Sequence, residues 1–196
     1  MMSCNGKAAA SAAGQDSAKA QSGKNLIVYF SHRGGTYMPG GIIDLEEGHT
    51  KRMAEKIQAT VGGDLLRIEP AKAYPRDYRQ CCDVAKVEHD GNQRPAITTK
   101  VPANIADYDT VYVGYPIWWG TFPMPVFTFL EQCDLSGKTV VPFSTNEGSG
   151  WGSSLADVKK CCPGSNIAEG LQLRGHAVAS SDTTITAWLK RITTKR

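Results

Sequence analysis

The sequence has no long apolar run, no large excess of one charge and no Cys-x-x-Cys pair. A membrane-spanning helix needs about 20 consecutive apolar residues, and no run approaches that length, so we predict no membrane span. The formal net charge of +3 is mild and provides no cationic stripe for duplex nucleic acid, so we predict no nucleic-acid partner. What remains is an ordinary globular composition, with 41% hydrophobic and 21% charged residues.

The six cysteines lack the spacing of a metal site or a disulfide framework. Cys81 and Cys82 are adjacent, as are Cys161 and Cys162, and neighbouring cysteines bridge each other only through a strained ring. We therefore predict reduced thiols and no bound metal. A bridge in space between the first pair and the second stays open at this point.

The first 23 residues are rich in Ala, Ser, Gly, Gln and Lys and carry almost no large apolar side chain. Such a segment cannot contribute to a core, so we predict a disordered tail over residues 1–23 and one domain over residues 24–196. A cytoplasmic location fits this interpretation. Alternatively, Ser3 and Cys4 are the remnant of a lipoprotein processing site, in which case the protein is exported or anchored to lipid.

The rest of the chain alternates between apolar runs and segments with helical spacing. Strands are predicted over residues 25–30, 65–68, 110–114, 139–144 and 166–173. Helices are predicted over residues 51–61, about 74–89, 126–130, 154–161 and 183–192. This alternation predicts a parallel sheet with helices on both faces. Pro142 cannot donate a ladder hydrogen bond, so irregular pairing is expected at that position.

A glycine-rich and hydroxyl-rich loop is predicted over residues 31–50, between the first strand and the first helix. The amino end of a helix exposes unpaired N–H groups and favours anions such as phosphate, and Ser31, Arg33, Thr36 and Thr50 could add donors. Neither a dinucleotide-binding fingerprint nor a Walker-type loop is present. The alternative is a connecting loop whose glycines serve only its turns.

Two further loops follow strands of the predicted sheet. Residues 114–120 contain the adjacent Trp118 and Trp119, and residues 145–152 are again rich in glycine. Because the carboxyl ends of parallel strands share one edge, where such folds bind ligands, we expect the three loops to converge. Adjacent tryptophans cannot both face one way in an extended segment, so we expect one to pack inward and the other to face a ligand. Glu147 is expected to be solvated.

Together these segments resemble the flavodoxin superfamily, over essentially all of residues 24–192. The similarity lies in Val28-Tyr-Phe-Ser31, Gly48-His-Thr50, Gly114-Tyr-Pro-Ile-Trp-Trp119, Leu135-Ser-Gly-Lys138 and Phe143-Ser-Thr-Asn-Glu-Gly-Ser-Gly150. It is closest to a bacterial flavodoxin-like branch with a long first loop. The resemblance implies an α/β fold, a flavodoxin-like three-layer sandwich whose five-stranded parallel sheet has the order 2-1-3-4-5, and non-covalently bound FMN.

The resemblance also implies which residues contact the cofactor. The phosphate-binding loop corresponds to Ser31, His32, Arg33, Gly48, His49 and Thr50. The loop that flanks the isoalloxazine ring corresponds to Pro116, Ile117, Trp118 and Trp119. The loop at the pyrimidine edge of the ring corresponds to Thr145, Asn146, Glu147, Gly148 and Gly150.

Two features depart from the family pattern. The compact T-G-N-T type of loop is split by residues 34–47, with His49 where asparagine is usual, and the chain is slightly basic whereas carrier flavodoxins are strongly acidic. Three functions therefore remain. The first is an FMN-binding redox protein that passes electrons to a partner protein. The second is an FMN-dependent oxidoreductase that uses NAD(P)H and a quinone or similar small acceptor. The third is a flavin-free binding module.

Overall fold

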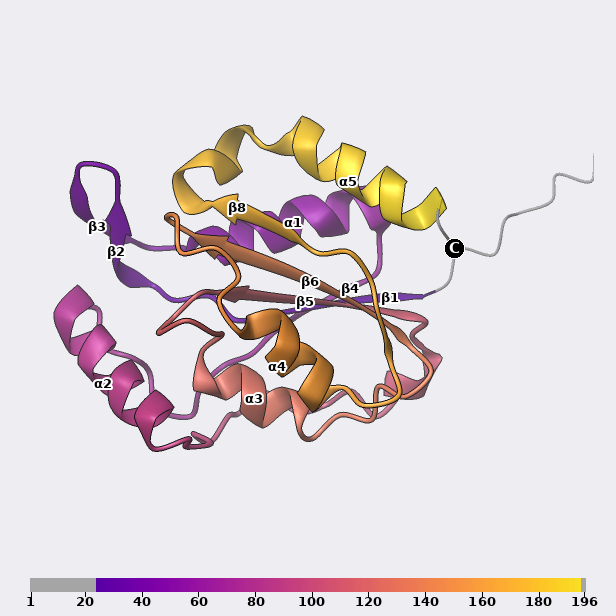
Figure 1. Cartoon of the computed structure of the whole chain (residues 1–196), viewed down its shortest axis with the longest axis horizontal. Helices are drawn as coiled ribbons and strands as arrows, with labels where there is room; N and C mark the ends of the chain where they lie inside the picture. Colours follow the sequence, from indigo (N-terminus) through magenta and orange to yellow (C-terminus); the bar gives the residue numbers. More distant parts are fainter. Residues whose placement is uncertain (1–23, 195–196) are drawn as a thin grey trace, which may run out of the picture.

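In a computed structural model of the chain, the structure describes residues 24–194, so the predicted tail over residues 1–23 lies outside the described residues. One mixed α/β unit contains a parallel sheet with helices above and below it (Figure 1). Its strands are β1 (Asn25–Tyr29), β4 (Asp64–Arg67), β5 (Thr110–Pro116), β6 (Thr139–Asn146), β7 (Asn166–Ile167) and β8 (Leu171–Arg174). The strand order is β4-β1-β5-β6, followed by β7 and β8 along the same edge of β6. The predicted flavodoxin-like fold is confirmed.

Two helical layers cover the sheet because its central strands bury both of their faces. Alternate residues of β1 enter different cores: Val28 belongs to one core and Ile27 to the other. The first core lies under α3 (Met124–Leu130) and α4 (Ser154–Cys161), and the second under α1 (His49–Val61) and α5 (Asp182–Thr194), as Figure 1 shows. Strands buried on both faces have nearly continuous apolar sequences, and this property made β1 and β5 recognisable.

Irregular pairing at Pro142 is confirmed, and it corrects the predicted fifth strand. β6 pairs continuously with β5, but its other edge pairs with β7 and then β8, which are separated by residues 168–170. On that outer edge the carbonyl groups of Lys138 and Val140 accept hydrogen bonds from the backbone N–H groups of residues 166 and 168. Pro142 is the next residue that faces this edge, and it has no N–H with which the ladder could continue. A single strand over residues 166–173 was therefore a wrong prediction.

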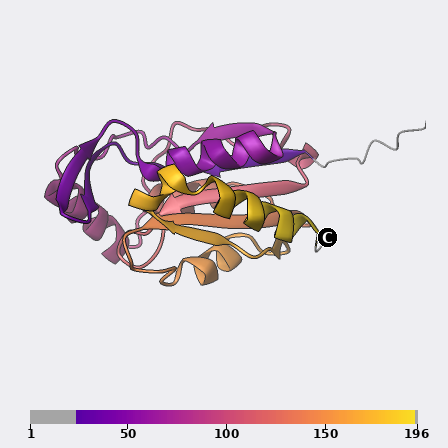
Figure 2. The same cartoon turned by 90° about the horizontal axis from the view of Figure 1, so that it is seen from above.

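The segment predicted as a glycine-rich loop contains a β-hairpin, β2 (Gly34–Met38) and β3 (Gly41–Leu45). Its two-residue turn is Pro39-Gly40, with Gly40 at φ +99°. Proline followed by glycine suits a turn whose second central residue needs a positive φ. The hairpin extends beyond the carboxyl edge of the sheet, at the same end as α2 (Tyr78–Asp90) (Figures 1 and 2).

Helix α2 begins at Tyr78, four residues later than expected. The side chain of Asp77 accepts a hydrogen bond of 2.9 Å from the backbone N–H of Gln80 and so caps the helix. Residues 74–77, including Pro75, precede this cap and are not helical. The connection over residues 94–107 contains one short 3-10 helix, Ile105–Asp107. A second 3-10 helix, η2 (Gly175–Ser180), follows β8.

The five cysteines that the structure describes are free, so Cys81 and Cys82 form no bridge with Cys161 or Cys162. Within residues 24–194 there is no cluster of three or more His, Cys, Asp or Glu side chains that could hold a metal ion. None of the helices in this part of the chain is long and apolar enough to span a bilayer.

Candidate functional site

A cavity of about 520 Å³ opens at the carboxyl edge of the sheet. Its walls come from the segment after β1, the hairpin, the start of α1, one face of α2, the loops after β5 and β6, and Gly175. Of the predicted cofactor-binding residues, those that line it are Ser31, His32, Gly48, His49, Thr50, Pro116, Ile117, Trp118, Trp119, Thr145, Asn146 and Glu147. Arg33, Gly148 and Gly150 are not in its lining, and Arg33 is exposed.

The amino end of α1 forms one end of this cavity. Gly48 precedes the helix without a side-chain cap, and a Cβ at Gly48 would lie only 2.4 Å from the carbonyl oxygen of His32. The Ser31 hydroxyl accepts a hydrogen bond of 3.2 Å from the backbone N–H of Lys51. The hydroxyl groups of Thr50 and Thr145 are 2.7 Å apart in the buried wall. A glycine is required at position 48 because the backbone that follows β1, at Ser31 and His32, passes so close to the start of α1.

His49 occupies the first turn of α1 and is buried. Its Nε2 lies 3.2 Å from the Met38 sulfur of the hairpin, while its Nδ1 is buried without a hydrogen-bond partner. Burial, assisted by the positive charge of Arg52, lowers the pKa of His49 below its ordinary value. The side chain is therefore a neutral imidazole at pH 7, with one buried nitrogen that has no partner in the protein.

His32 is also a neutral imidazole, in an aromatic corner of the cavity. Its ring lies 5.6 Å from that of Trp118 and 6.4 Å from that of Tyr74, in edge-on arrangements. Burial lowers the pKa of His32 to about 4, and the charges of Arg76 and Arg67 act in the same direction. Its Nε2 is buried without a partner. Two cavity histidines thus retain unsatisfied ring nitrogens.

The two tryptophans divide as expected, one inward and one outward. Trp118 packs edge-on against Phe30, His32 and Tyr74, whereas Trp119 is 46% exposed. They belong to a tight turn in which the backbone groups of Trp118 and Thr121 exchange hydrogen bonds, with Trp119 at φ +50° and Gly120 at φ +82°. Positive φ at both central residues defines a type I′ turn, which is unfavourable for tryptophan.

Trp119 is also tied to α2. Its indole N–H donates a hydrogen bond of 3.1 Å to the backbone carbonyl of Cys82, and the ammonium group of Lys86 lies 5.1 Å from the centre of its ring. Left-handed backbone at a bulky residue is strained, and such strain is concentrated at functional sites. The turn therefore holds an aromatic side chain at the mouth of the cavity.

The expectation that Glu147 is solvated was wrong. Its side chain is only 11% exposed and accepts hydrogen bonds from the backbone N–H of His176 at 2.9 Å and from Nδ1 of the same residue at 2.6 Å. A Cβ at Gly175 would lie 2.5 Å from His49 and 2.9 Å from Glu147. The carboxylate thus joins the loop after β6 to η2, next to the amino end of α1.

Sequence reasoning missed the part of the lining that comes from the hairpin and α2. The missed residues are Gly35, Thr36, Tyr37, Tyr78, Cys81, Cys82, Ala85, Ser149 and Gly175, although Thr36 was noted as a potential donor. Two signals were available. Pro39-Gly40 separates short runs of β-branched and aromatic residues, which is a hairpin pattern, and Tyr78, Cys81, Cys82 and Ala85 have the spacing of one helix face.

The fold and the cavity define the class of the protein: an open α/β protein with a cavity where the order of its parallel strands reverses, which is where such folds commonly bind ligands. A sequence model of the flavodoxin family matches residues 45–192, and the chain belongs to this family. Among curated proteins, none matches the chain.

Solved structures support the same assignment. A protein of Bacteroides eggerthii described as a flavoprotein is 40% identical, with a TM-score of 0.69 over 87% of this chain and 98% of its own. A second protein so described, from Bacteroides uniformis, is 32% identical, with a TM-score of 0.67 over 86% of this chain and 98% of its own. A flavoprotein from Lactobacillus acidophilus, solved in complex with FMN, shares the fold at 21% identity and a TM-score of 0.58, over 81% and 97% of the two chains.

Proposed function

We propose that this protein binds FMN in the cavity at the carboxyl edge of the sheet and acts as a flavodoxin-like redox protein that transfers electrons. Membership of the flavodoxin family supports the proposal, as does the FMN complex of the Lactobacillus acidophilus flavoprotein. The observation that carries it is the composition of the cavity. The cavity combines the amino end of α1, with the imidazole of His49 in its first turn, and an aromatic and apolar wall in which the imidazole of His32 packs against Trp118.

The helix start fits a phosphate group. Gly48 provides no side-chain cap, and the Lys51 N–H of the first turn is bonded to the Ser31 hydroxyl. A helix terminus presents about half a positive charge to an anion. Ser31 and Thr50 add hydroxyl groups to the lining. No lysine or arginine from residues 24–194 lines the cavity, so backbone N–H groups and neutral side chains would hold the phosphate.

The opposite wall fits a flat ring. Ile117 and Trp118 are packed against the core, and the Ile117 N–H donates a hydrogen bond of 3.1 Å to the Thr145 carbonyl, which joins the loops after β5 and β6. Trp119 has a ring that is not enclosed by other aromatic side chains and is therefore our candidate for contact with the isoalloxazine. Aromatic stacking contributes about 0.5–1.5 kcal/mol beyond burial.

FMN, when bound, supplies the electron-transfer chemistry, and the protein controls its surroundings. Trp119 and Ile117 would exclude water from the ring, and an apolar wall disfavours added negative charge, so it lowers the reduction potential. The carboxylate of Glu147 is held by His176 at the edge of the site, where it would oppose further negative charge. Both effects make the bound flavin a stronger reductant.

A second candidate function is an FMN-dependent oxidoreductase acting on a small acceptor with NAD(P)H as the donor. The hairpin favours it, because β2 and α2 extend the cavity beyond the family's three ligand loops and leave space next to a bound ring. Neither candidate requires a different fold. They differ in whether electrons enter and leave through proteins or through small molecules.

A flavin titration tests the proposal. We expect the purified protein to bind FMN with micromolar or tighter affinity, and to bind riboflavin about tenfold more weakly because riboflavin lacks the phosphate that the helix start would hold. Replacement of Thr50 by valine should narrow that difference, whereas Thr60→Val, at an exposed position of the same helix, should leave it unchanged. Absence of any change in the flavin spectrum would refute FMN binding and leave the flavin-free module.

Once FMN is bound, the donor distinguishes the two redox functions. Anaerobic addition of NADH or NADPH should bleach the flavin rapidly if the protein is an oxidoreductase. Bleaching that requires a separate reductase would identify a carrier. The wild-type protein serves both measurements, because the spectrum of the bound flavin reports its reduction directly.

A further inference from the structure

The hairpin and α2 form a part of the cavity that lies outside the three loops assigned to FMN. The backbone N–H of Gly35 donates a hydrogen bond of 2.6 Å to the Arg76 carbonyl, and a Cβ at Gly35 would lie 2.8 Å from the backbone nitrogen of Tyr78. The hairpin and the start of α2 are therefore in direct contact. Both project past the carboxyl edge of the sheet, as Figures 1 and 2 show.

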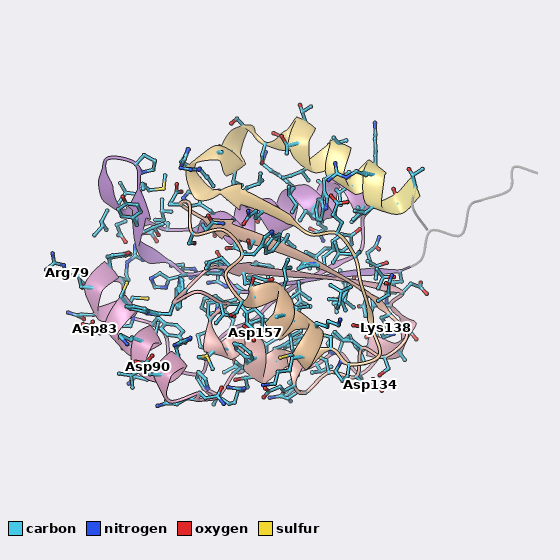
Figure 3. The ribbon with its side chains drawn as sticks, viewed as in Figure 1. Arg79, Asp83, Asp90, Asp134, Lys138 and Asp157 are labelled. Atoms are coloured by element: carbon cyan, nitrogen blue, oxygen red, sulfur yellow. The ribbon has the colours of Figure 1, made fainter. Side chains whose placement is uncertain are left out.

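One face of α2 is turned toward this space and carries no charge. Tyr78, Cys81, Cys82 and Ala85 line the cavity and recur at the spacing of a single helix face. The charged side chains of Arg79 and Asp83 are exposed and point away from the body of the protein (Figure 3). On the other side, the hairpin contributes Gly35, Thr36 and Tyr37, which are also uncharged.

The Cys81 thiol and the Tyr78 phenol of this wall keep their protons at neutral pH. Burial raises the pKa of the Cys81 thiol to about 12, and burial together with the neighbouring Cys82 raises the pKa of Tyr78. A phenol and a thiol that remain protonated can donate hydrogen bonds but cannot balance a charge. Within the described residues, the cavity lining contains no lysine or arginine and has Glu147 as its carboxylate.

The mouth of this space is flanked by aromatic rings. Tyr37 is 55% exposed and Trp119 is 46% exposed, although both line the cavity. The hydrogen bond from Trp119 to the Cys82 carbonyl attaches the second ring to α2. Large exposed rings at a cavity mouth favour a flat aromatic ligand, because stacking adds to the apolar contact.

We propose that the β2–β3 hairpin and α2 form a compartment, walled by Gly35, Thr36, Tyr37, Tyr78, Cys82 and Ala85, that binds a small, flat, uncharged aromatic molecule next to the FMN site. The proposal rests on the proposed function, because FMN is assigned to the rest of the cavity. It adds a ligand class and names the residues that select it. Among the described residues the lining itself offers an anionic ligand no compensating cation, because the Lys86 ammonium lies outside it, 5.1 Å from the centre of the Trp119 ring. Desolvation of an anion inside the compartment is therefore unfavourable.

The test uses the FMN-loaded protein and two ligands of nearly the same shape, the neutral 2-naphthamide and the anionic 2-naphthoate. Calorimetric titration should show saturable binding of the amide, with the carboxylate at least about tenfold weaker. Replacement of Ala85 by phenylalanine should fill the compartment and weaken amide binding about tenfold or more, while the affinity for FMN is retained. Val87→Phe is the matched control, because Val87 is an exposed residue of the same helix outside the cavity lining.

The outcomes separate this proposal from the proposed function. If the protein takes up FMN but does not bind 2-naphthamide, the proposed compartment is refuted and the proposed function is not. The same holds if it binds 2-naphthoate as well as 2-naphthamide. A protein without flavin absorbance refutes both proposals. Equal binding of the amide by wild type and Ala85→Phe also overturns the assignment. If Ala85→Phe does not fold, the exposed Tyr37 is replaced by serine, which should weaken amide binding about fivefold without loss of FMN.

Discussion

The hydroxyl groups of Thr50 and Thr145 lie 2.7 Å apart in the interior and join the first turn of α1 to the carboxyl end of β6. Replacement of Thr145 by valine preserves the shape but leaves the buried Thr50 hydroxyl without this partner. We expect the free energy of unfolding to fall by about 1–3 kcal/mol, measured by urea denaturation. FMN affinity should fall as well, because the two loops lose their direct link.

Thr60→Val is the control for this substitution. Thr60 lies in α1, but its hydroxyl is exposed and bonds only to the Lys56 carbonyl one turn earlier. Its replacement should change the free energy of unfolding by less than about 0.5 kcal/mol. Equal effects of the two substitutions would show that the buried contact adds nothing.

Gly114 is required by packing. A Cβ at this position would lie 2.1 Å from the ring of Phe143, which is fully buried in the neighbouring strand β6. Gly114→Ala should therefore lower the free energy of unfolding by about 1–3 kcal/mol, because a packed core cannot accommodate the extra methyl group. Gly91→Ala at the end of α2 is the control, since its nearest side-chain neighbour is the flexible Gln93. A mild effect at Gly114 in thermal or urea unfolding would contradict the prediction.

The two tryptophans should respond differently to substitution. Trp118→Ala removes a ring packed against Phe30 and Tyr74, so we expect a loss of about 3 kcal/mol in the free energy of unfolding. Trp119→Gly should change stability by less than about 1 kcal/mol, because glycine relieves the strained backbone at φ +50° as the ring contacts are lost. FMN should nevertheless bind about tenfold more weakly to the Trp119 variant. Unchanged FMN affinity there would refute the proposed ring contact.

The lowered pKa of His32 leads us to expect that the protein loses stability in mild acid. Its pKa is about 4 in the folded protein, below the ordinary value of 6.5, so the unfolded chain binds a proton more readily. Above pH 6.5 the imidazole is neutral in both states and contributes no pH dependence. As the pH falls from 6.5 to about 4, the free energy of unfolding decreases by at most about 1.4 kcal/mol per pH unit for this one group.

His32→Gln should reduce that acid sensitivity, as measured by the urea midpoint at pH 7 and pH 4.5. Some dependence will remain, because the pKa of His49 is lowered by burial and acts with the same sign. His89→Gln is the comparison variant at an exposed position, and it should change the difference between the two pH values less than His32→Gln does. A variant profile that matches wild type at both pH values would exclude His32 as the source.

The parts of the fold that follow from simple patterning were predictable from the sequence. Residues 25–30 and 110–114 are almost continuously apolar, and alternate residues enter the two cores. Each segment was therefore recognisable as a strand covered on both faces. The three converging loops followed from the parallel order, and their ligand remains a prediction. Gly48 was predicted to belong to the phosphate-binding loop before a helix at residues 51–61, whereas the helix begins at His49 and the close approach of Gly48 to His32 is visible only in three dimensions.

The missed features depend on contacts between distant segments. The sequence of residues 34–47 contains a hairpin pattern around Pro39-Gly40, but the attachment of the hairpin to the start of α2 through Arg76 is not visible in it. Likewise, Glu147 has the sequence context of a solvated loop, but η2 places the backbone of His176 against its carboxylate. The position of the hairpin against α2 and the burial of Glu147 both depend on tertiary partners, which local sequence patterns do not identify.

Arg76 forms the contacts that we expect to limit the motion of the hairpin against α2. Its guanidinium pairs with Asp44 and Glu46 of the hairpin segment at 2.7 Å, and its backbone carbonyl accepts the hydrogen bond from Gly35. Arg76→Ala should leave global stability nearly unchanged, because exposed ion pairs contribute little. Amide hydrogen exchange in β2 and β3 should become faster, since the hairpin loses its side-chain attachment while the sheet does not.

Arg94→Ala is the matched control, because Arg94 forms a comparable exposed pair with Glu131 far from the hairpin. It should not alter exchange in residues 34–45. If the hairpin wall selects the aromatic ligand, Arg76→Ala should also weaken 2-naphthamide binding while FMN stays bound, because a more mobile wall must be ordered again on binding. Unchanged exchange in Arg76→Ala would mean that the Gly35 hydrogen bond and the packing on Tyr78 hold the hairpin without the ion pairs.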